Sequence, residues 1–387
     1  MVRALCAALA CAVASSAPVA CAPLGGSPAA APSFAPVHRA GSARWLFVSD
    51  LHFDPFANPR LVDRLAAAPP RAWQRIIDAD RAQPSAGIFH DTNAALLRSA
   101  LAAMDAAAPQ PRMVVIAGDF LAHHFRERYD AARTPGPRDA AGREAAYDAF
   151  VDATIAYLAV AFDRRFPRAR FLVTIGNNDG YCGDYASTPE SPSLAHLATA
   201  WQPLVDRGGA APDFARSFPH LGAYVARLPL RSDVRALVVN SVYWSPAYGN
   251  VCARNDGRQA PAEFAWMARA ARAGTSATRW WLLTHIPPGI DAFASLETQS
   301  VRTMYAPAAL RGLRALRLSG GRGFALIVAG HTHASAFRVA RGAGGPGVAP
   351  VTIVPAITPV NVDMLPALKD GDSAMHRSYD TKRFLLR

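Results

Sequence analysis

Short apolar runs, each followed at once by polar or glycine residues, recur along the chain from about residue 45. Runs of this kind are typical of buried β-strands. Five of them end in motifs rich in Asp, Asn and His: Trp45 to Val48, Met113 to Ala117, Phe171 to Ile175, Trp280 to Leu283 and Phe324 to Ala329. A sixth run, Ala236 to Val239, ends at Asn240. The pattern predicts several short, buried strands.

Segments with apolar residues at helical spacing lie between these runs. They are Asn93 to Asp105, Ala145 to Phe162 and Pro261 to Arg272. Strands that alternate with helices favour an α/β fold with parallel strands. We interpret the last of these helices as the crossover into the strand at Trp280.

Other stretches are expected to be loops. The polar, arginine-rich stretch Arg126 to Glu144 contains Pro135-Gly136-Pro137 and is predicted to be a loop. The glycine-rich stretch Arg341 to Gly347 is predicted to be a flexible hairpin loop. It is not a phosphate-binding loop, because it lacks the Gly-Lys-Ser/Thr ending. The proline-containing excursion between Asp50 and Asp119 is expected to overhang the ends of the strands.

Aromatic residues near the strand ends have two interpretations. Trp280 and Trp281 are expected to be core residues. Tyr243, Trp244 and Tyr248 follow a strand end, so they are expected either in the core or along a pocket for a base or an acyl chain.

The five motifs that end the strands are Asp50-Leu51-His52, Gly118-Asp119, Gly176-Asn177-Asn178-Asp179, Thr284-His285 and Gly330-His331-Thr332-His333. Open α/β sheets gather their active sites at the carboxyl ends of the strands. The motifs supply two carboxylates, one amide oxygen and four imidazoles: Asp50, His52, Asp119, Asn177, His285, His331 and His333. This ligand set suits two divalent cations, with Zn favoured over Mn or Fe.

The order of the motifs resembles the calcineurin-like metallophosphoesterase family, whose pattern is D-x-H, G-D, G-N-H-[DE], H and G-H-x-H. The resemblance runs from about Trp45 to about Asn361 and implies a four-layer αββα sandwich. It also implies that Asp50, His52 and His333 hold one metal and that Asn177, His285 and His331 hold the other. Asp119 would bridge the two ions. The implied reaction is hydrolysis of a phosphoester, with a water between the ions attacking phosphorus in line.

One residue departs from the family pattern. Asn178 stands where the family usually has a histidine, and an amide cannot deliver a proton near neutral pH. The segment from Gly118 to His124 is similar to the acid sphingomyelinase branch of the family, which implies His123 as the general acid, with His124 as the less favoured alternative. Both could instead be surface histidines at the start of a helix. Asn178 is expected to add a hydrogen bond to the phosphoryl group, and Asp179 to orient its neighbours.

Three further segments resemble the same branch. The first follows the apolar run that ends at Val239, the second contains the run that ends at Leu283, and the third ends at Asn361. The roughly 45 residues before the first motif lack the six cysteines of a saposin-like domain, so small or partly exposed phosphodiesters such as nucleotides or choline diesters are the expected substrates. The alternatives are a phosphomonoesterase or polyphosphatase on the same fold and an exported binding protein that does not turn over substrate.

Composition changes this picture little. The formal net charge is +12, the hydrophobic fraction is 51%, and Lys369 and Lys382 are the only lysines. Because no basic run stands out, we expect a solvated basic surface rather than specific nucleic-acid binding. The even spread of the motifs favours a single catalytic domain over residues 43–387, and the oligomeric state stays open.

The amino-terminal residues predict export. Residues 1–22 have a basic start and the apolar segment Ala4 to Val13 of a secretory signal, with cleavage after Ala22 or, alternatively, lipidation at Cys21. Residues 23–42 are rich in Ala, Pro, Gly and Ser and are expected to form a flexible linker. We expect a periplasmic or secreted protein that contacts a membrane only through such an anchor. Export favours a disulfide between Cys182 and Cys252, with two free thiols as the alternative.

Overall fold

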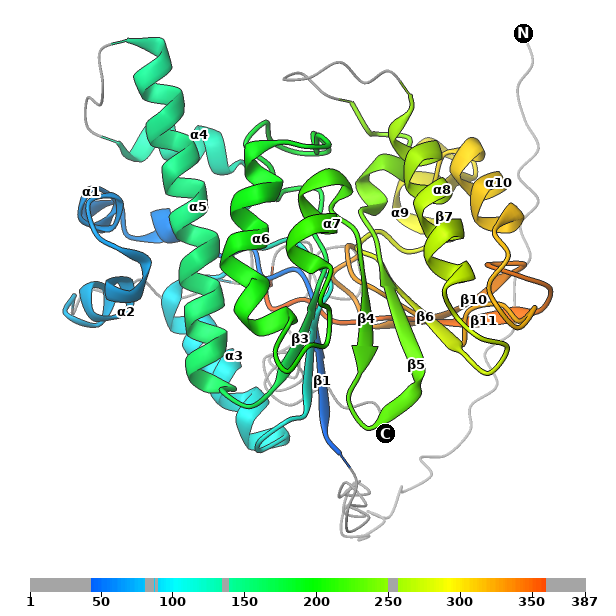
Figure 1. Cartoon of the computed structure of the whole chain (residues 1–387). Coiled ribbons are helices and arrows are strands. Elements are labelled where there is room, and N and C mark those ends of the chain that lie inside the picture. Colours follow the sequence, from blue (N-terminus) through cyan, green and yellow to red (C-terminus); the bar gives the residue numbers. More distant parts are fainter. Residues whose placement is uncertain (1–42, 81–86, 88–89, 134–138, 250–256, 360–387) are drawn as a thin grey trace, which may run out of the picture. The chain divides into compact units, whose positions relative to one another are not determined.

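The computed structural model describes residues 43–80, 87, 90–133, 139–249 and 257–359 (Figure 1). The predicted signal at 1–22, the linker at 23–42, Cys21 and Cys252 all lie outside these residues. The residues from Ala43 onward belong to one compact unit.

Two main sheets contain most of the strands. The first has the order β1-β2-β3, all parallel, and consists of β1 (Trp45–Val48), β2 (Met113–Ile116) and β3 (Arg170–Val173). The second has the order β10-β11-β9-β6-β5-β4 and consists of β4 (Tyr224–Leu228), β5 (Arg231–Val238), β6 (Arg279–Leu283), β9 (Leu326–Ala329), β10 (Ala336–Arg341) and β11 (Val348–Ile353). Its four inner strands are parallel, and both edge strands are antiparallel to their neighbours. β7 (Ile290–Asp291) and β8 (Arg302–Thr303) form a small separate pair.

Helices cover the outer face of each sheet (Figure 1). The helices that precede the second sheet are α1 (Val62–Ala66), α2 (Pro70–Asp78), α3 (Ala94–Ala107), α4 (Phe125–Ala132), α5 (Ala140–Arg165), α6 (Pro192–Val205) and α7 (Phe214–Leu221). Those within the second half are α8 (Gln259–Arg272), α9 (Ala292–Thr298) and α10 (Pro307–Ala315). Short 3-10 helices are η1 (Pro55–Ala57), η2 (Pro59–Leu61) and η3 (Ser241–Trp244). The predicted αββα sandwich is confirmed.

Side chains between the sheets lock them together. The ring of Trp45 on β1 packs edge-on against Trp281 on β6, with 5.5 Å between the centroids. Tyr224 on β4 uses its hydroxyl to accept from the Val173 amide at 2.9 Å and to donate to the Val173 carbonyl at 3.0 Å. These two bonds satisfy the backbone of Val173 at the outer edge of β3, beside which no further strand lies among the described residues. The core roles expected for Trp280 and Trp281 are confirmed, since Trp280 is buried and Trp281 packs between the sheets.

Most of the expected elements form close to their expected bounds. The helices predicted before β2, before β3 and before β6 are α3, α5 and α8, and α8 connects the parallel strands β5 and β6. The glycine-rich hairpin connection between β10 and β11 is also confirmed. α5 is long and apolar enough to cross a membrane by length and composition alone, but half of its apolar stretch is buried inside the protein. It therefore serves as a core helix of the sandwich.

The prediction that the stretch Arg126 to Glu144 is all loop is wrong. α4 occupies its first part because Phe125 and Tyr129, four residues apart, bury one face of a helix against Phe150 on α5, with ring centroids 6.2 and 5.4 Å away. α5 then begins at Ala140, where the side chain of Asp139 accepts from the Gly142 amide at 2.7 Å. Helical packing partners far along the chain outweighed the polar composition of the segment.

The excursion after β1 lies partly away from the strand ends. Its helices α1 and α2 pack against α5, whereas the segment that reaches the ligand edge is Asp91 to Asn93, through a bond from the Thr92 amide to the His52 carbonyl at 3.0 Å. Tyr243 and Trp244 are buried core residues, and Trp244 stacks on Phe264 with centroids 4.8 Å apart. The structure therefore assigns these two aromatic residues to the core and not to a pocket.

Candidate metal centre

The loops that carry the predicted ligands are held in an unusual backbone conformation. Asp50, His52, Asp119, His331 and His333 have φ angles of 50°, 38°, 54°, 73° and 56°. Residues with a side chain rarely adopt this left-handed region, and such strain concentrates at functional sites. Each loop turns sharply at the end of its strand, which brings the side chains back over the edge of the sheets.

Two motif glycines are required by close approach. A methyl group at Gly176 would overlap the carboxylate of Asp119, and one at Gly330 would overlap the hydroxyl of Ser49 and touch the carboxylate of Asp50. The glycines therefore let the loops after β3 and β9 lie directly against the carboxylates that follow β2 and β1.

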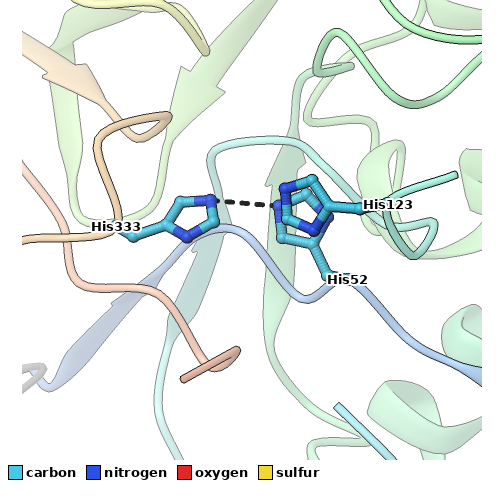
Figure 2. Close-up of side chains that lie close together, drawn as sticks. All are labelled: His52, His123 and His333. Carbon is cyan, nitrogen blue, oxygen red and sulfur yellow. Dashed lines mark hydrogen bonds between the residues drawn. The ribbon is translucent and has the colours of Figure 1, made fainter. Parts of the chain in front are cut away.

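The first half of the predicted ligand set lies around His52. Its Nε2 is 3.3 Å from Asp119 Oδ2 and 3.1 Å from His333 Nε2. His333 Nε2 is in turn 3.7 Å from Asp50 Oδ1. Figure 2 shows His52 and His333 facing each other across the end of the sheet, with His123 beside them. The structure thus brings together all three side chains predicted for the first metal.

The second half lies around His285. Its Nε2 is 2.9 Å from Asn177 Oδ1 and 3.3 Å from Asp119 Oδ2. His331 Nδ1 lies 3.3 Å from the same His285 nitrogen. Asp119 therefore contacts both halves through a single carboxylate oxygen, and all seven predicted ligands lie in one connected cluster.

The hydrogen bonds behind the imidazoles decide which nitrogen faces the cluster. His52 Nδ1 donates to the Leu121 carbonyl at 2.9 Å, and His285 Nδ1 donates to the Ala117 carbonyl at 2.7 Å. In the neutral form of each ring the lone pair is then on Nε2, the atom that points at Asp119. His331 is held from the opposite side, because the Tyr185 hydroxyl lies 3.2 Å from its Nε2 and leaves Nδ1 toward the cluster.

The amide of Asn177 is oriented in the same way. Its Nδ2 donates to Asp184 Oδ1 at 2.6 Å, so its Oδ1 is the atom directed at His285. Carbonyl and carboxylate oxygens with neutral imidazole nitrogens are the ligands that divalent transition ions take in proteins. The donor set and its orientation therefore fit a pair of such ions.

Proton binding at these residues follows from burial and from Asp119. Burial lowers the pKa of His52 and of His331 to about 3 in each case. Burial also lowers the pKa of His285, but the adjacent Asp119 carboxylate raises it more, to about 9. Although burial raises the pKa of Asp119, the charges on His285 and His52 hold it well below its usual range. In the absence of a cation, a proton on His285 takes the place of the positive charge next to Asp119.

His123 is held by a buried carboxylate that the sequence did not single out. Asp91 accepts from His123 Nδ1 at 2.8 Å and from the His123 backbone amide at 2.9 Å. Asp91 is 1% exposed and also accepts from Thr358 Oγ1 at 3.2 Å, with an Arg128 nitrogen at 3.4 Å. The His123 ring stacks on His52 with 3.9 Å between centroids, and both belong with His333 to one group of nitrogens within 4.8 Å (Figure 2).

The alternative acid, His124, is exposed and precedes the first residue of α4. Burial is the largest single influence on His123 and lowers its pKa, but the hydrogen bond to Asp91 together with the negative charges of Asp91, Asp119 and Asp184 makes the net shift upward. Of the two histidines, only His123 has a buried carboxylate on its ring and the metal cluster at its face.

Asn178 and Asp179 both serve the loops around Asp119. Asn178 donates its backbone amide and its Nδ2 to the two oxygens of Asp119, each at 2.9 Å. Asp179 accepts from the Phe120 amide at 2.6 Å and from the Gly176 amide at 2.7 Å. Burial and the nearby charge of Asp119 raise the pKa of Asp179 to about 7. Asn178 therefore contacts Asp119 directly, while Asp179 ties the loops after β2 and β3 together.

Sequence reasoning missed Asp91, Asp184 and Tyr185. Asp184 and Tyr185 come soon after Asn177, so their position in the same loop was a usable signal. Asp91 is 32 residues before His123, and nothing in its surroundings marks it. Cys182, in that loop after Asn177, is disulfide-bonded, whereas its predicted partner Cys252 lies outside the described residues, so the pairing stays a prediction.

A comparison with protein families assigns the chain to one of them. The profile of the family described as Calcineurin-like phosphoesterase matches residues 43–335, and the chain belongs to that family. Acid sphingomyelinase-like phosphodiesterase 3b of Mus musculus is 24% identical over 333 residues, which cover 85% of this chain and 65% of the relative. The solved structure of PhoD matches 82% of this chain and 56% of its own with 10% identity and a TM-score of 0.38. The chain thus spans less than two thirds of each.

Family and site together define the class of protein. The buried His and Asp cluster is consistent with a dinuclear metal site in a member of the calcineurin-like phosphoesterase family. Two divalent cations bound there would supply positive charge to the phosphoryl oxygens and lower the pKa of the attacking water.

Proposed function

We propose that the protein hydrolyses phosphodiesters, with Asp50, His52 and His333 holding one cation, Asn177, His285 and His331 the other, and Asp119 bridging them. Zinc matches the four imidazoles best, with manganese or iron as alternatives. The observation that carries hydrolysis with a general acid is the contact of His123 with Asp91 on one side and with His52 on the other. The choice of a diester is supported by the similarity to a relative named as a phosphodiesterase.

His123 supports this reaction as the general acid. With Nδ1 donating to Asp91, the proton for transfer is the one on Nε2. As the bond between phosphorus and the leaving oxygen breaks, that proton moves to the oxygen, so the departing group leaves as a neutral alcohol and a phosphomonoester remains. The raised pKa of His123 favours the protonated form that this step needs.

We propose a task for Asn178 other than the predicted hydrogen bond to the phosphoryl group. Its Nδ2 donates to Asp119 Oδ2, so we assign it to orienting the bridging carboxylate and not to contacting the phosphoryl group. A substrate among small or partly exposed diesters, such as nucleotide or choline diesters, is supported by the similarity to a relative named as a phosphodiesterase. Export to the periplasm or beyond, with an anchor at Cys21 as the alternative, is supported by the disulfide at Cys182.

The test compares two chromogenic substrates on the mature protein loaded with Zn or Mn. We expect kcat/KM for bis-p-nitrophenyl phosphate to be well above that for p-nitrophenyl phosphate. The opposite ratio would move the assignment to a phosphomonoesterase or polyphosphatase. Turnover of neither ester, nor of nucleotide and choline diesters, would favour a binding protein.

A further inference from the structure

A second cavity lies apart from the metal centre. It has a volume of about 660 Å³ and opens between α7 and α8, which flank β4 and β5 in Figure 1. We call it the arginine groove and define it by Arg216 on α7, Arg227 on β4, Arg235 on β5, and Trp266 and Arg269 on α8. None of its lining residues is a predicted metal ligand or a residue that contacts one.

Charge in the arginine groove is unbalanced. Asp213 is the one carboxylate among its lining residues, and it already pairs with Arg216 at 2.5 Å. Arg227 and Arg235 are direct partners in the antiparallel register of β4 and β5. Like charges placed opposite each other on neighbouring strands destabilise a sheet unless something offsets them.

Within the described part of the chain, no carboxylate offsets that pair. Arg235 donates to the Ala273 carbonyl at 3.3 Å, and neither Arg227 nor Arg269 forms an ion pair with any described residue. An anion held between the guanidinium groups would remove the repulsion, and planar guanidinium groups match phosphate geometry. Unlike the scattered arginines of a solvated surface, these come from two helices and two strands to one cavity.

The rest of the lining is apolar. Trp266 is half-buried, and Leu221, Val225 and Ala270 lie around the same space. Pockets of a few hundred cubic ångströms that combine an apolar wall with a few charged groups are typical of small-molecule sites. Trp and Arg side chains both pack favourably on the face of a planar ring.

We propose that the arginine groove binds an organic phosphate that carries a planar ring, at a site separate from the metal centre. The phosphate lies between Arg227, Arg235 and Arg269, and the ring lies against Trp266. This inference goes beyond the proposed reaction and does not depend on it, because no groove residue takes part in hydrolysis.

The test uses naphthalene-1-phosphonate, whose carbon–phosphorus bond the hydrolase cannot cleave as an ester. Titration calorimetry on the metal-loaded, full-length protein is expected to show binding at the groove. In the double variant Arg227→Ala/Arg235→Ala the groove affinity is expected to fall by about tenfold or more, since each removed guanidinium is a charged hydrogen-bond donor. Arg311→Ala, an exposed arginine on α10 outside the groove, is the matched control and should leave binding unchanged.

A catalytic assay distinguishes failure of this proposal from failure of the proposed function. Hydrolysis of bis-p-nitrophenyl phosphate should be the same in the double variant and the control, which also shows that both fold. Unchanged phosphonate binding in the double variant would overturn the groove as a site, whatever the activity on diesters proves to be.

Two further probes test the ring. Methylphosphonate and octylphosphonate carry the same charged group with no ring, and both are expected to bind at least several-fold more weakly than the naphthyl compound. Trp266→Leu should weaken the naphthyl compound and leave methylphosphonate unchanged. Octylphosphonate that binds as tightly as the naphthyl compound would overturn the assignment of a planar ring.

Discussion

The loops after the three-stranded sheet and those after the six-stranded sheet bring different chemistry to the metal centre. The loops after the first sheet carry every proposed oxygen ligand, Asp50, Asp119 and Asn177, together with one imidazole, His52. The second sheet supplies imidazoles alone, His285, His331 and His333. The negative charge of the site therefore comes from one sheet and most of its proton-binding nitrogens come from the other.

This division makes metal binding depend on how the sheets dock. Each proposed cation takes ligands from both sheets, so neither sheet alone offers a complete site. The side chains that join the sheets, Trp45 with Trp281 and Tyr224 with β3, are consequently part of what positions the ligands. Four experiments test how the site depends on both sheets, in order of decreasing expected effect.

Removing the charge shared by both halves should have the largest effect. Asp119→Asn is expected to abolish binding of the metal pair. Its kcat/KM for diesters should fall by more than the roughly 10–100-fold that is typical when a residue hydrogen-bonded to a metal ligand is lost. Metal content by atomic emission and turnover of bis-p-nitrophenyl phosphate measure it. Asp130→Asn, an exposed aspartate on α4, is the control. Near-full activity in Asp119→Asn would contradict a bridged metal pair.

Asp91→Asn tests the role of His123, the proposed general acid in the loop after β2, without changing a proposed metal ligand. We expect a loss of about 10–100-fold for diesters with alkyl leaving groups and little change for nitrophenyl esters, because only poor leaving groups need the proton of His123. Asp54→Asn is the matched control, since Asp54 also pairs with Arg128, at 2.7 Å, but forms no bond with His123. Equal losses on both kinds of ester would assign Asp91 to stability alone.

Acid should weaken metal binding through one histidine of the second sheet. The pKa of His285 is raised to about 9, so a cation must displace its proton at any lower pH, whereas His52 and His331, with pKa values lowered to about 3, are already neutral. We expect the affinity of the metal-free protein for Zn to fall about tenfold per unit between pH 8 and 6.5. Titration in metal buffers at several pH values measures this slope. An affinity for Zn that does not change with pH, or that changes about a thousandfold per pH unit, would contradict the prediction.

Loosening the contact between the sheets should have the smallest effect. Tyr224→Phe leaves the amide and carbonyl of Val173 without their partner and is expected to cost about 1–3 kcal/mol of stability. Urea unfolding with and without Zn measures it, with a modest fall in metal affinity expected as well. Tyr157→Phe, whose hydroxyl bonds Gln74 on the helical side at 2.9 Å, should lower stability without changing metal affinity. Equal metal affinity in the unchanged protein and in both variants would show that the contact between the sheets does not position the metal ligands.

The proposed ligands, which the structure brings together, could be located from the sequence because each lies in a motif that follows a short apolar run. A strand end and the turn after it are local features, and parallel strands bring their carboxyl ends to one edge whatever the details of packing. Asp91 could not be found in this way, because its bond to His123 depends on where the long excursion after β1 returns to the sheet. α4 was missed for a similar reason, since its apolar face is short and its partner Phe150 is on another helix.

The arginine groove shows the same limit for charge. Arg216, Arg227, Arg235 and Arg269 form no cluster along the chain, and only the packing of α7 and α8 beside β4 and β5 brings them into one cavity. Net charge alone indicated a basic surface, not a site.

The types of side chain proposed as ligands, their order along the chain and their place at the strand ends followed from the sequence, because these depend on residue type and on interactions between near neighbours. The tertiary structure decided which nitrogen of each imidazole faces the cluster, which carboxylate holds His123, and that Asn178 contacts Asp119. Hydrogen bonds between residues tens of positions apart require atoms to meet within about 3 Å, and only the packed arrangement of both sheets sets such distances.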